Sequence, residues 1–374
     1  MKPIFVLLAI VLSFAEALSI SQLSLTEKFP SYEYVLREFD IDKHYIENVE
    51  FVDFVLTNEE KYRRFYENSA RRGKKYIPLF KDLLVSDGLS HLFVYMSMTE
   101  SGFQTYAKSS AHAAGLWQFM SATARRFNLK VDGKVDERFD PVASTEAASK
   151  YIRALYSMFG KWYLVMMAYN CGEGRLKKAI ARAGTDDFET LMDSRLKYIP
   201  AETRRYLQKI VLLSMMGERI RTAPTKREKK IREKILPSTE TLVNVYGGSS
   251  MSEIASLLDI NPGELRRLNP QMIKDEIPED ISITQIFIPT RTLKRFRALY
   301  RPPTTQEIFA KRGYSKLIAH VVKRGESLRE IAMKYRATEL DLIIVNELKS
   351  KKLTPGKVLM IPVSKKIYES RLKY

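Results

Sequence analysis

Apolar residues recur at helical spacing along the N-terminal part of the chain. Phe51, Phe54 and Val55 fall at positions i, i+3 and i+4, which places them on one face of a helix. Leu92–Met98 is a dense apolar stretch, and similar runs follow it without the alternation that is typical of strands. The pattern predicts a mostly α-helical region, preceded by a further helical segment over residues 18–75.

Two segments interrupt this pattern. Residues 130–140 are rich in charge and contain Gly133, so we expect a loop there. Residues 225–234 read Thr-Lys-Arg-Glu-Lys-Lys-Ile-Arg-Glu-Lys, which is typical of a solvated connector. The connector places the end of the helical region near residue 222.

The C-terminal part contains an internal repeat, in which five residues of one unit recur 77 positions later. A repeat of this kind indicates modular architecture. The matched pairs are Gly248 and Gly325, Ile254 and Ile331, Ala255 and Ala332, Leu265 and Leu342, and Asn269 and Asn346. Each unit is predicted to run strand, helix, helix, strand, although the first unit lacks a clear sequence motif for its opening strand. The elements expected in the second unit are Ile318–Val322, Leu328–Tyr335, Glu339–Asn346 and Val358–Ile361.

The N-terminal residues predict export. Lys2 is followed by the apolar run Ile4–Leu12 and by Ala15-Glu16-Ala17, the small-x-small pattern that a signal peptidase reads. We expect a signal peptide over residues 1–17, and an uncleaved membrane anchor is the alternative. No cysteine follows directly, so we expect no lipid anchor. The predicted location is the periplasm, with association to a membrane left open.

Composition narrows the choice of partners. The net charge of +18 favours polyanions such as nucleic acid, an anionic membrane surface or an acidic wall polymer. Export argues against nucleic acid, whereas peptidoglycan carries free carboxylates on its stem peptides. The four histidines and the single cysteine, Cys171, show no spacing typical of a metal cluster. We therefore expect no metal and no other cofactor.

Glu100 is the candidate for acid chemistry. It ends the apolar stretch and precedes Ser101 and Gly102, a natural helix stop. A carboxyl group at the end of a buried helix is partly desolvated, which raises its pKa and keeps it protonated, as a glycosidic general acid requires. Taken alone, such a residue is usually a surface glutamate.

Three further motifs strengthen the hypothesis. They are Gly115-Leu116-Trp117-Gln118-Phe119, Ala168-Tyr169-Asn170-Cys171-Gly172, and Ile199-Pro200-Ala201-Glu202-Thr203 followed by Tyr206. Aromatic rings and amides of this kind bind sugars. A buried core tryptophan and ordinary helix capping are the structural alternatives.

Together with Glu100-Ser101, these motifs occur in the order and spacing of a lytic transglycosylase catalytic domain. Residues 76–222 resemble the membrane-bound lytic murein transglycosylase D family. The resemblance implies a mainly α, lysozyme-like domain in which Glu100 protonates the glycosidic oxygen between N-acetylmuramic acid and N-acetylglucosamine. It further implies that the C6 hydroxyl of the sugar attacks the anomeric carbon, which leaves a 1,6-anhydro product. Substrate-binding roles are implied for Ser101, which would orient Glu100, and for Ser109, Gln118, Tyr169, Asn170 and Tyr206.

A single well-placed acid fits this chemistry. Ordinary glycosidases need two carboxylates, whereas an intramolecular nucleophile removes the need for the second. The candidates for a second carboxylate are Asp132, Asp136, Glu137 and Asp140, which we expect to be solvated loop charges. The alternatives are a hydrolytic muramidase resembling goose-type lysozyme and a non-catalytic wall-binding protein.

The last repeat unit, from His320 to Pro362, resembles a LysM module, which implies binding of glycans that contain N-acetylglucosamine. The first unit resembles a degenerate LysM. The expected fold class is mainly α, with small α+β modules of the βααβ type at the C-terminus. The expected segments are a signal peptide (1–17), a helical segment (18–75), the catalytic domain (76–222), a basic linker (223–237), a degenerate LysM-like module (238–292), a second linker (293–316), the LysM domain (317–363) and a tail (364–374).

Overall fold

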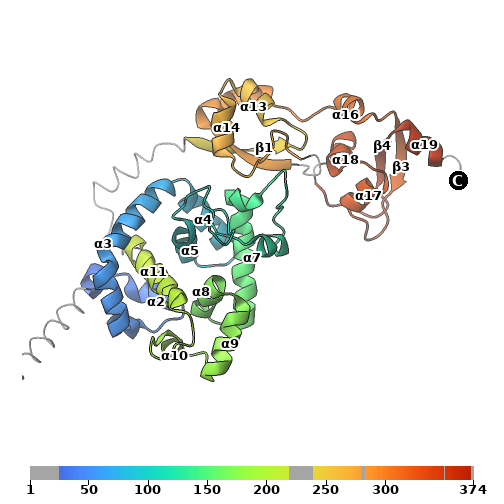
Figure 1. Ribbon diagram of the computed structural model, residues 1–374. Coiled ribbons are helices and arrows are strands. Elements are labelled where there is room, and N and C mark those ends of the chain that lie inside the picture. The colour runs from blue at the N-terminus through green and yellow to red at the C-terminus, as the bar shows by residue number, and fades with distance from the viewer. Residues whose placement is uncertain (1–24, 219–238, 279–282, 349, 372–374) are drawn as a thin grey trace, which may run out of the picture. The chain divides into compact units, whose positions relative to one another are not determined.

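The computed structural model describes four stretches of the chain, residues 25–218, 239–278, 283–348 and 350–371 (Figure 1). The expected signal peptide and all of the expected basic linker lie outside these residues. The chain divides into two compact units. Among the described residues, the first comprises residues 25–131 and 137–218, and the second comprises residues 132–136 and those from 239 onward.

The first unit is built from helices, as the apolar spacing predicts. Its α-helices are α2 (Tyr32–Glu38), α3 (Val49–Arg72), α4 (Tyr76–Ser86), α5 (Val94–Ser101), α6 (Ser121–Arg126), α7 (Pro141–Phe159), α8 (Trp162–Cys171), α9 (Glu173–Ala183), α10 (Phe188–Met192) and α11 (Ala201–Gly217). Its 3-10 helices are η1 (Lys43–Glu47), η2 (His91–Phe93) and η3 (Glu137–Phe139).

Helix α11 is the central helix of this unit. It packs against α2, α3, α5 and α8, and most of its side chains are buried (Figure 1). A helix that is apolar around most of its circumference is stable only when neighbours cover it on several sides. The N-terminal helices supply part of that cover, since Phe51, Phe54 and Val55 of α3 are buried as expected. The predicted helical segment before residue 76 is thus part of the same folded unit.

The second unit holds two small modules, each with a two-stranded antiparallel sheet. In the first, β1 (Glu240–Tyr246) pairs with β2 (Ile283–Pro289) around α13 (Met251–Leu258) and α14 (Pro262–Leu268). In the second, β3 (Lys316–Val321) pairs with β4 (Val358–Val363) around α17 (Leu328–Lys334) and α18 (Glu339–Val345). Between and after the modules lie η4 (Thr290–Thr292), α15 (Leu293–Leu299), α16 (Thr305–Arg312) and α19 (Lys365–Arg371).

The first module has the predicted order of strand, helix, helix and strand, although the sequence shows no clear motif for its opening strand. Strand β1 pairs in register from Glu240 with Pro289 to Tyr246 with Ile283. Only Val243 and Val245 turn buried apolar side chains inward, with the exposed Asn244 between them. The alternation is too short to be recognised in the sequence, although it is sufficient once β2 covers it.

The repeated residues have the same structural roles in both modules. Gly248 and Gly325 adopt φ angles of 80° and 89°, a conformation that side chains rarely tolerate. Asn269 donates to the carbonyls of Leu265 and Phe287, and Asn346 donates to the carbonyls of Leu342 and Met360. Each asparagine therefore ties the end of the second helix to the last strand.

Among the described residues, no helix is both long and apolar enough to cross a membrane.

Candidate active site

Glu100 lies in the last turn of α5, at the end of a helix that is otherwise almost completely buried. Gly102 ends the helix with a φ of 56°, and its N–H donates to the Met98 carbonyl at 2.8 Å. A Cβ atom on Gly102 would lie 2.9 Å from Nη2 of Arg72, so the packing also favours glycine at this position. The turn therefore fixes the direction in which the side chain of Glu100 points away from the helix.

The carboxyl group of Glu100 is surrounded by protein, although the residue keeps part of its surface exposed. Burial raises the pKa of Glu100 to about 7. The hydroxyl of Tyr206 donates to Oε1 at 2.7 Å, and this bond and the charge of Lys209 oppose the rise of the pKa. The negative charge of Glu202 adds to it. Near neutral pH, both protonation states of Glu100 are therefore accessible.

Glu202, Tyr206 and Lys209 all come from α11. Their spacing of i, i+4 and i+7 places them on one face of the helix, and this face is turned toward Glu100. Of these three residues, Tyr206 is the one for which the sequence predicts a role in the site. The other two were missed because a charged residue on a helix is usually solvated. Periodicity from Tyr206 places them on the same helix face but does not show what that face contacts.

The segment around Gly115 forms a tight turn whose amide side chain points back into it. Gly115 has a φ of 81°, and a Cβ atom there would lie 1.7 Å from the carbonyl oxygen of Arg138. Gln118 also has a positive φ, of 49°, and its Nε2 donates to the carbonyls of Gly115 and Ala107 at 2.8 and 3.1 Å. The amide is thus partly engaged by backbone and is half-buried.

Trp117 is a core residue, which decides between the two interpretations of its motif. It is fully buried, and its Nε1 donates to Oγ1 of Thr145 at 2.9 Å. Its ring packs against that of Phe80. A sugar ring therefore cannot stack on Trp117 without opening the core.

The two expected serines have different surroundings. Ser101 is 5% exposed, and its hydroxyl donates to the carbonyls of Leu116 and Ser97 at 2.9 and 3.1 Å. It therefore ties the end of α5 to the turn that carries Gln118, and it acts on the neighbouring Glu100 through the backbone. Ser109 is exposed, and its Oγ accepts a hydrogen bond from the N–H of Ala113 at 3.0 Å.

The end of α8 supplies Tyr169 and Asn170. The hydroxyl of Tyr169 donates to the Trp117 carbonyl at 2.8 Å, and Oδ1 of Asn170 accepts from the Thr203 hydroxyl at 2.8 Å. Burial and the charge of Glu100 hold the pKa of Tyr169 well above its usual value, so the phenol stays protonated. The structure thus brings Tyr169 to Glu100 and links Asn170 to α11.

The carboxylates of residues 130–140 are not all solvated, contrary to expectation. Asp136 and Asp140 are buried. Asp140 is the N-cap of α7 and accepts from the N–H groups of Val142 and Ala143, while Glu137 accepts from the N–H of Lys130. Asp132 is exposed and also accepts backbone hydrogen bonds. Asp132, Glu137 and Asp140 thus supply acceptors to backbone N–H groups in and next to the loop.

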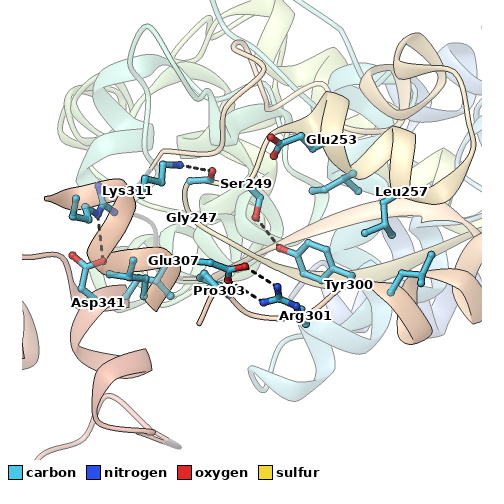
Figure 2. Close-up of a pocket in the computed structure, with 16 residues that line it drawn as sticks. Gly247, Ser249, Glu253, Leu257, Tyr300, Arg301, Pro303, Glu307, Lys311 and Asp341 are labelled. Carbon is cyan, nitrogen blue, oxygen red and sulfur yellow. Dashed lines mark hydrogen bonds and ion pairs between the residues drawn. The ribbon is translucent and has the colours of Figure 1, made fainter. Parts of the chain in front are cut away.

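The second unit has a cavity of about 380 Å³ next to α16 (Figure 2). Its polar side chains pair with one another. Arg301 bonds Glu307, the Tyr300 hydroxyl bonds Ser249, and Lys311 donates to the Gly248 carbonyl (Figure 2). This pairing connects α16 with the first module. We therefore interpret the cavity as part of the packing between α16 and that module. Glu100 remains the candidate catalytic centre.

Comparison with protein families identifies three matching domains. The transglycosylase SLT domain family matches residues 85–192, and the LysM domain family matches residues 320–362. The family described as lytic transglycosylase MltD, LysM-like domain matches residues 239–304. The resemblance predicted from the four motifs and from the repeat is confirmed by these matches.

Individual relatives agree with the domain matches. The chain is 29% identical over 331 residues to membrane-bound lytic murein transglycosylase D of Escherichia coli strain K12, covering 83% of this chain and 69% of that protein. It is 31% identical over 166 residues to membrane-bound lytic murein transglycosylase C of Photorhabdus laumondii, covering 37% of this chain and 46% of that protein. The crystal structure of the 70 kDa soluble lytic transglycosylase from Escherichia coli aligns with a TM-score of 0.33 and 22% identity, covering 38% of this chain and 24% of that one.

Proposed function

The chain is an enzyme of the lytic murein transglycosylase family that carries LysM domains, and from this premise we propose that it cleaves peptidoglycan glycan strands without consuming water. The bond cleaved is the β-1,4 linkage between N-acetylmuramic acid and N-acetylglucosamine. The observation that carries the proposal is Glu100, a partly exposed residue at the end of α5 whose carboxyl group is surrounded by protein, so that burial raises its pKa to about 7.

In the first step, Glu100 is the general acid. Its proton passes to the glycosidic oxygen as the bond from that oxygen to the anomeric carbon breaks, and N-acetylglucosamine leaves with a free hydroxyl. Near neutrality a substantial fraction of Glu100 is protonated and ready for this step. Tyr206 stabilises the carboxylate that results, because its hydroxyl already donates to Oε1.

In the second step, the same carboxylate is the base. It takes the proton of the C6 hydroxyl as that oxygen bonds to the anomeric carbon, which closes the 1,6-anhydro ring and restores Glu100 to its acid form. The nucleophile is part of the substrate, so it has a high effective concentration and the site needs no activated water. General acid–base catalysis by one positioned group contributes about 10²- to 10⁴-fold to the rate.

We assign substrate contacts to Gln118, Tyr169, Asn170 and Ser109, the half-buried and exposed polar residues of the site. Ser101 is assigned the role of holding the Glu100 turn against the turn that carries Gln118. The catalytic domain is assigned to residues 76–222, with the N-terminal helices packed against it. A location in the cell envelope is proposed from the similarity to a membrane-bound relative.

The LysM modules are proposed to bind N-acetylglucosamine-containing glycan and to keep the catalytic unit on its polymer. The second module has a complete apolar core that includes Leu328, Ile331, Leu359 and Ile361. The high positive charge of the chain supports the same partner, since stem peptides are acidic.

Digestion of purified sacculi in ¹⁸O-labelled water tests the reaction. We expect mass spectrometry of the soluble products to show 1,6-anhydro ends without the label. Reducing ends that carry ¹⁸O would instead identify a hydrolytic muramidase. If sacculi bind the protein and release nothing, the chain is a wall-binding protein and the proposal is wrong.

A further inference from the structure

Two cations hold the backbone on either side of Glu100. Nζ of Lys209 donates to the carbonyl of Thr99 at 3.1 Å, and Nε of Arg72 donates to the carbonyl of Gly102 at 2.8 Å. These carbonyls belong to the last turn of α5, where the orphan carbonyls of a helix concentrate negative charge. The cations therefore satisfy acceptors and offset the helix dipole at the place where Glu100 must carry its negative charge.

Helix α3 places both cations. Arg72 is its last residue, and Lys209, although it comes from α11, rests on side chains of α3. Its Nζ lies 4.0 Å from the ring centroid of Phe65 and 5.8 Å from that of Tyr62. An ammonium group over an aromatic face is attracted by the ring, and the attraction increases as the pair is desolvated. Helix α3 lies before the matched SLT domain at residues 85–192, and α11 lies after it.

The charges of Lys209 and Glu100 influence each other's pKa values, which supports an electrostatic interaction between the two groups. Burial lowers the pKa of Lys209 to about 8, while the charge of Glu100 opposes that fall. The reciprocal effect is present at Glu100, where the charge of Lys209 opposes the rise of the pKa. Desolvation of a lysine in this setting costs free energy. The bond to the Thr99 carbonyl, the two ring faces and the charge of Glu100 offset part of that cost.

We propose that Lys209, held against Phe65 and Tyr62, is a positioning residue that stabilises the carboxylate of Glu100 between the two proton transfers. The proposal rests on the proposed function, since it concerns the same acid. The proposal gives α3 a role in catalysis, because side chains of this helix, which precedes the matched SLT domain, hold Lys209 next to the turn that carries Glu100.

Other titratable groups also influence the pKa values of Glu100 and Lys209 and therefore contribute to the pH profile of the wild type. Glu202 and Tyr206 face it from α11, and Tyr169 faces it from α8. Lys61 of α3 acts on Lys209, and its positive charge favours the neutral amine. None of these is altered by a substitution at Lys209, so a change in the pH profile reports on the lysine itself.

The test is the pH profile of the Lys209→Met variant on a soluble glycan. Glu100 must be protonated for the first step, so activity is lost as pH rises through its pKa. Removing a nearby cation destabilises the carboxylate and raises that pKa, so the alkaline limb of the profile moves to higher pH, by about one unit. The kcat value falls by up to about tenfold at neutral pH, because the carboxylate intermediate is less stable. The KM value stays within about twofold of that of the wild type, since the role proposed for Lys209 involves no contact with substrate.

Three variants complete the design. Lys209→Arg keeps a cation and should retain the wild-type limb. Phe65→Leu removes the nearer aromatic ring from the ammonium and should move the limb in the same direction as Lys209→Met, but by less. Lys177→Met removes an exposed lysine from α9 and should leave both kcat and the profile unchanged.

Superimposable profiles for Lys209→Met and the wild type would overturn the inference, even if the amplitude of activity fell. So would a shifted limb in Lys209→Arg equal to that of Lys209→Met. If Lys209→Met fails to fold, as judged by circular dichroism, Lys209→Arg and Phe65→Leu still decide the question. Failure of the proposed function is seen separately, as reducing ends or as full activity of Glu100→Gln in the same assay.

Discussion

The hydroxyl of Tyr206 donates a hydrogen bond of 2.7 Å to Oε1 of Glu100 across 106 positions of the chain. The bond favours the carboxylate, whereas burial favours the acid, and the balance holds the pKa of Glu100 at about 7. A group at this pKa can give up its proton and take one back at similar cost, which is the requirement for one residue that serves as both acid and base.

Replacing Tyr206 with phenylalanine removes this donor while keeping the ring. A hydrogen bond to a charged group contributes about 1.5–3 kcal/mol, so we expect kcat to fall by about 10- to 100-fold. The pKa of Glu100 should rise, which moves the alkaline limb of the pH–rate profile upward. Release of soluble muropeptides from sacculi, followed over a range of pH, measures both effects. A Tyr206→Phe enzyme with wild-type kcat and an unmoved limb would contradict the role of the bond.

Replacing Glu100 with glutamine keeps the shape of the side chain and removes its titratable proton. Because Glu100 is assigned to both proton transfers, we expect activity to fall by about 10⁴-fold, the upper end of the range for general acid–base catalysis. Turbidity of sacculi and chromatography of released muropeptides provide the measurement, with binding to sacculi as the control for folding. Retention of more than about a tenth of wild-type release would remove Glu100 from the mechanism.

Glu202 is the rival for the role of a second carboxylate. It is exposed in the first turn of α11, and its charge raises the pKa of Glu100. If Glu100 acts alone, Glu202→Gln keeps anhydro products, and loss of the negative charge lowers the pKa of Glu100. The alkaline limb then moves to lower pH, opposite to the shift expected for Tyr206→Phe. Loss of activity with no shift of the limb would indicate that Glu202 is a base for water and would favour hydrolysis.

Glu202 and Asp140 differ in how well the sequence predicts their roles, and the difference shows which features of the fold and site sequence patterns can identify. The sequence predicts helices, repeat modules and Glu100, because apolar periodicity and motif order are local and survive in the folded state. It also identifies Asp140 as a carboxylate to consider. The structure shows that Asp140 caps α7 with two backbone bonds, at 2.8 and 2.9 Å, and that Glu202 is the carboxylate whose charge acts on Glu100.

Lys209, Phe65 and Arg72 could not have been assigned from the sequence. They come from two helices that flank the catalytic motifs, and their contacts with the Glu100 turn depend on how α3 and α11 pack. A cation–π contact has no sequence signature, since lysines and phenylalanines are common on any amphipathic helix. The repeated Asn346 is the opposite case, because its role is local to its module and recurs at Asn269.

Removal of residues 317–374 should weaken binding to sacculi without stopping the reaction. The truncation takes away the βααβ module except Lys316, the first residue of β3, and with it the separate apolar core. Arg312 and Tyr314 lose their bonds to Asp341, but they become open to solvent and are not left buried without a partner. Because one of two linked glycan-binding parts is lost, co-sedimentation with sacculi should fall by at least about tenfold.

Turnover of short soluble glycans should stay within about twofold of the wild type, since Glu100, Tyr206 and Lys209 belong to the other unit. Leu359→Asp in the full-length chain is the matched variant, because it places a charge in the core of the same module and leaves the chain length unchanged. Both variants should lose sacculus binding and keep soluble turnover. If soluble turnover disappears in both, the module stabilises the catalytic unit, and the separation of binding from catalysis is wrong.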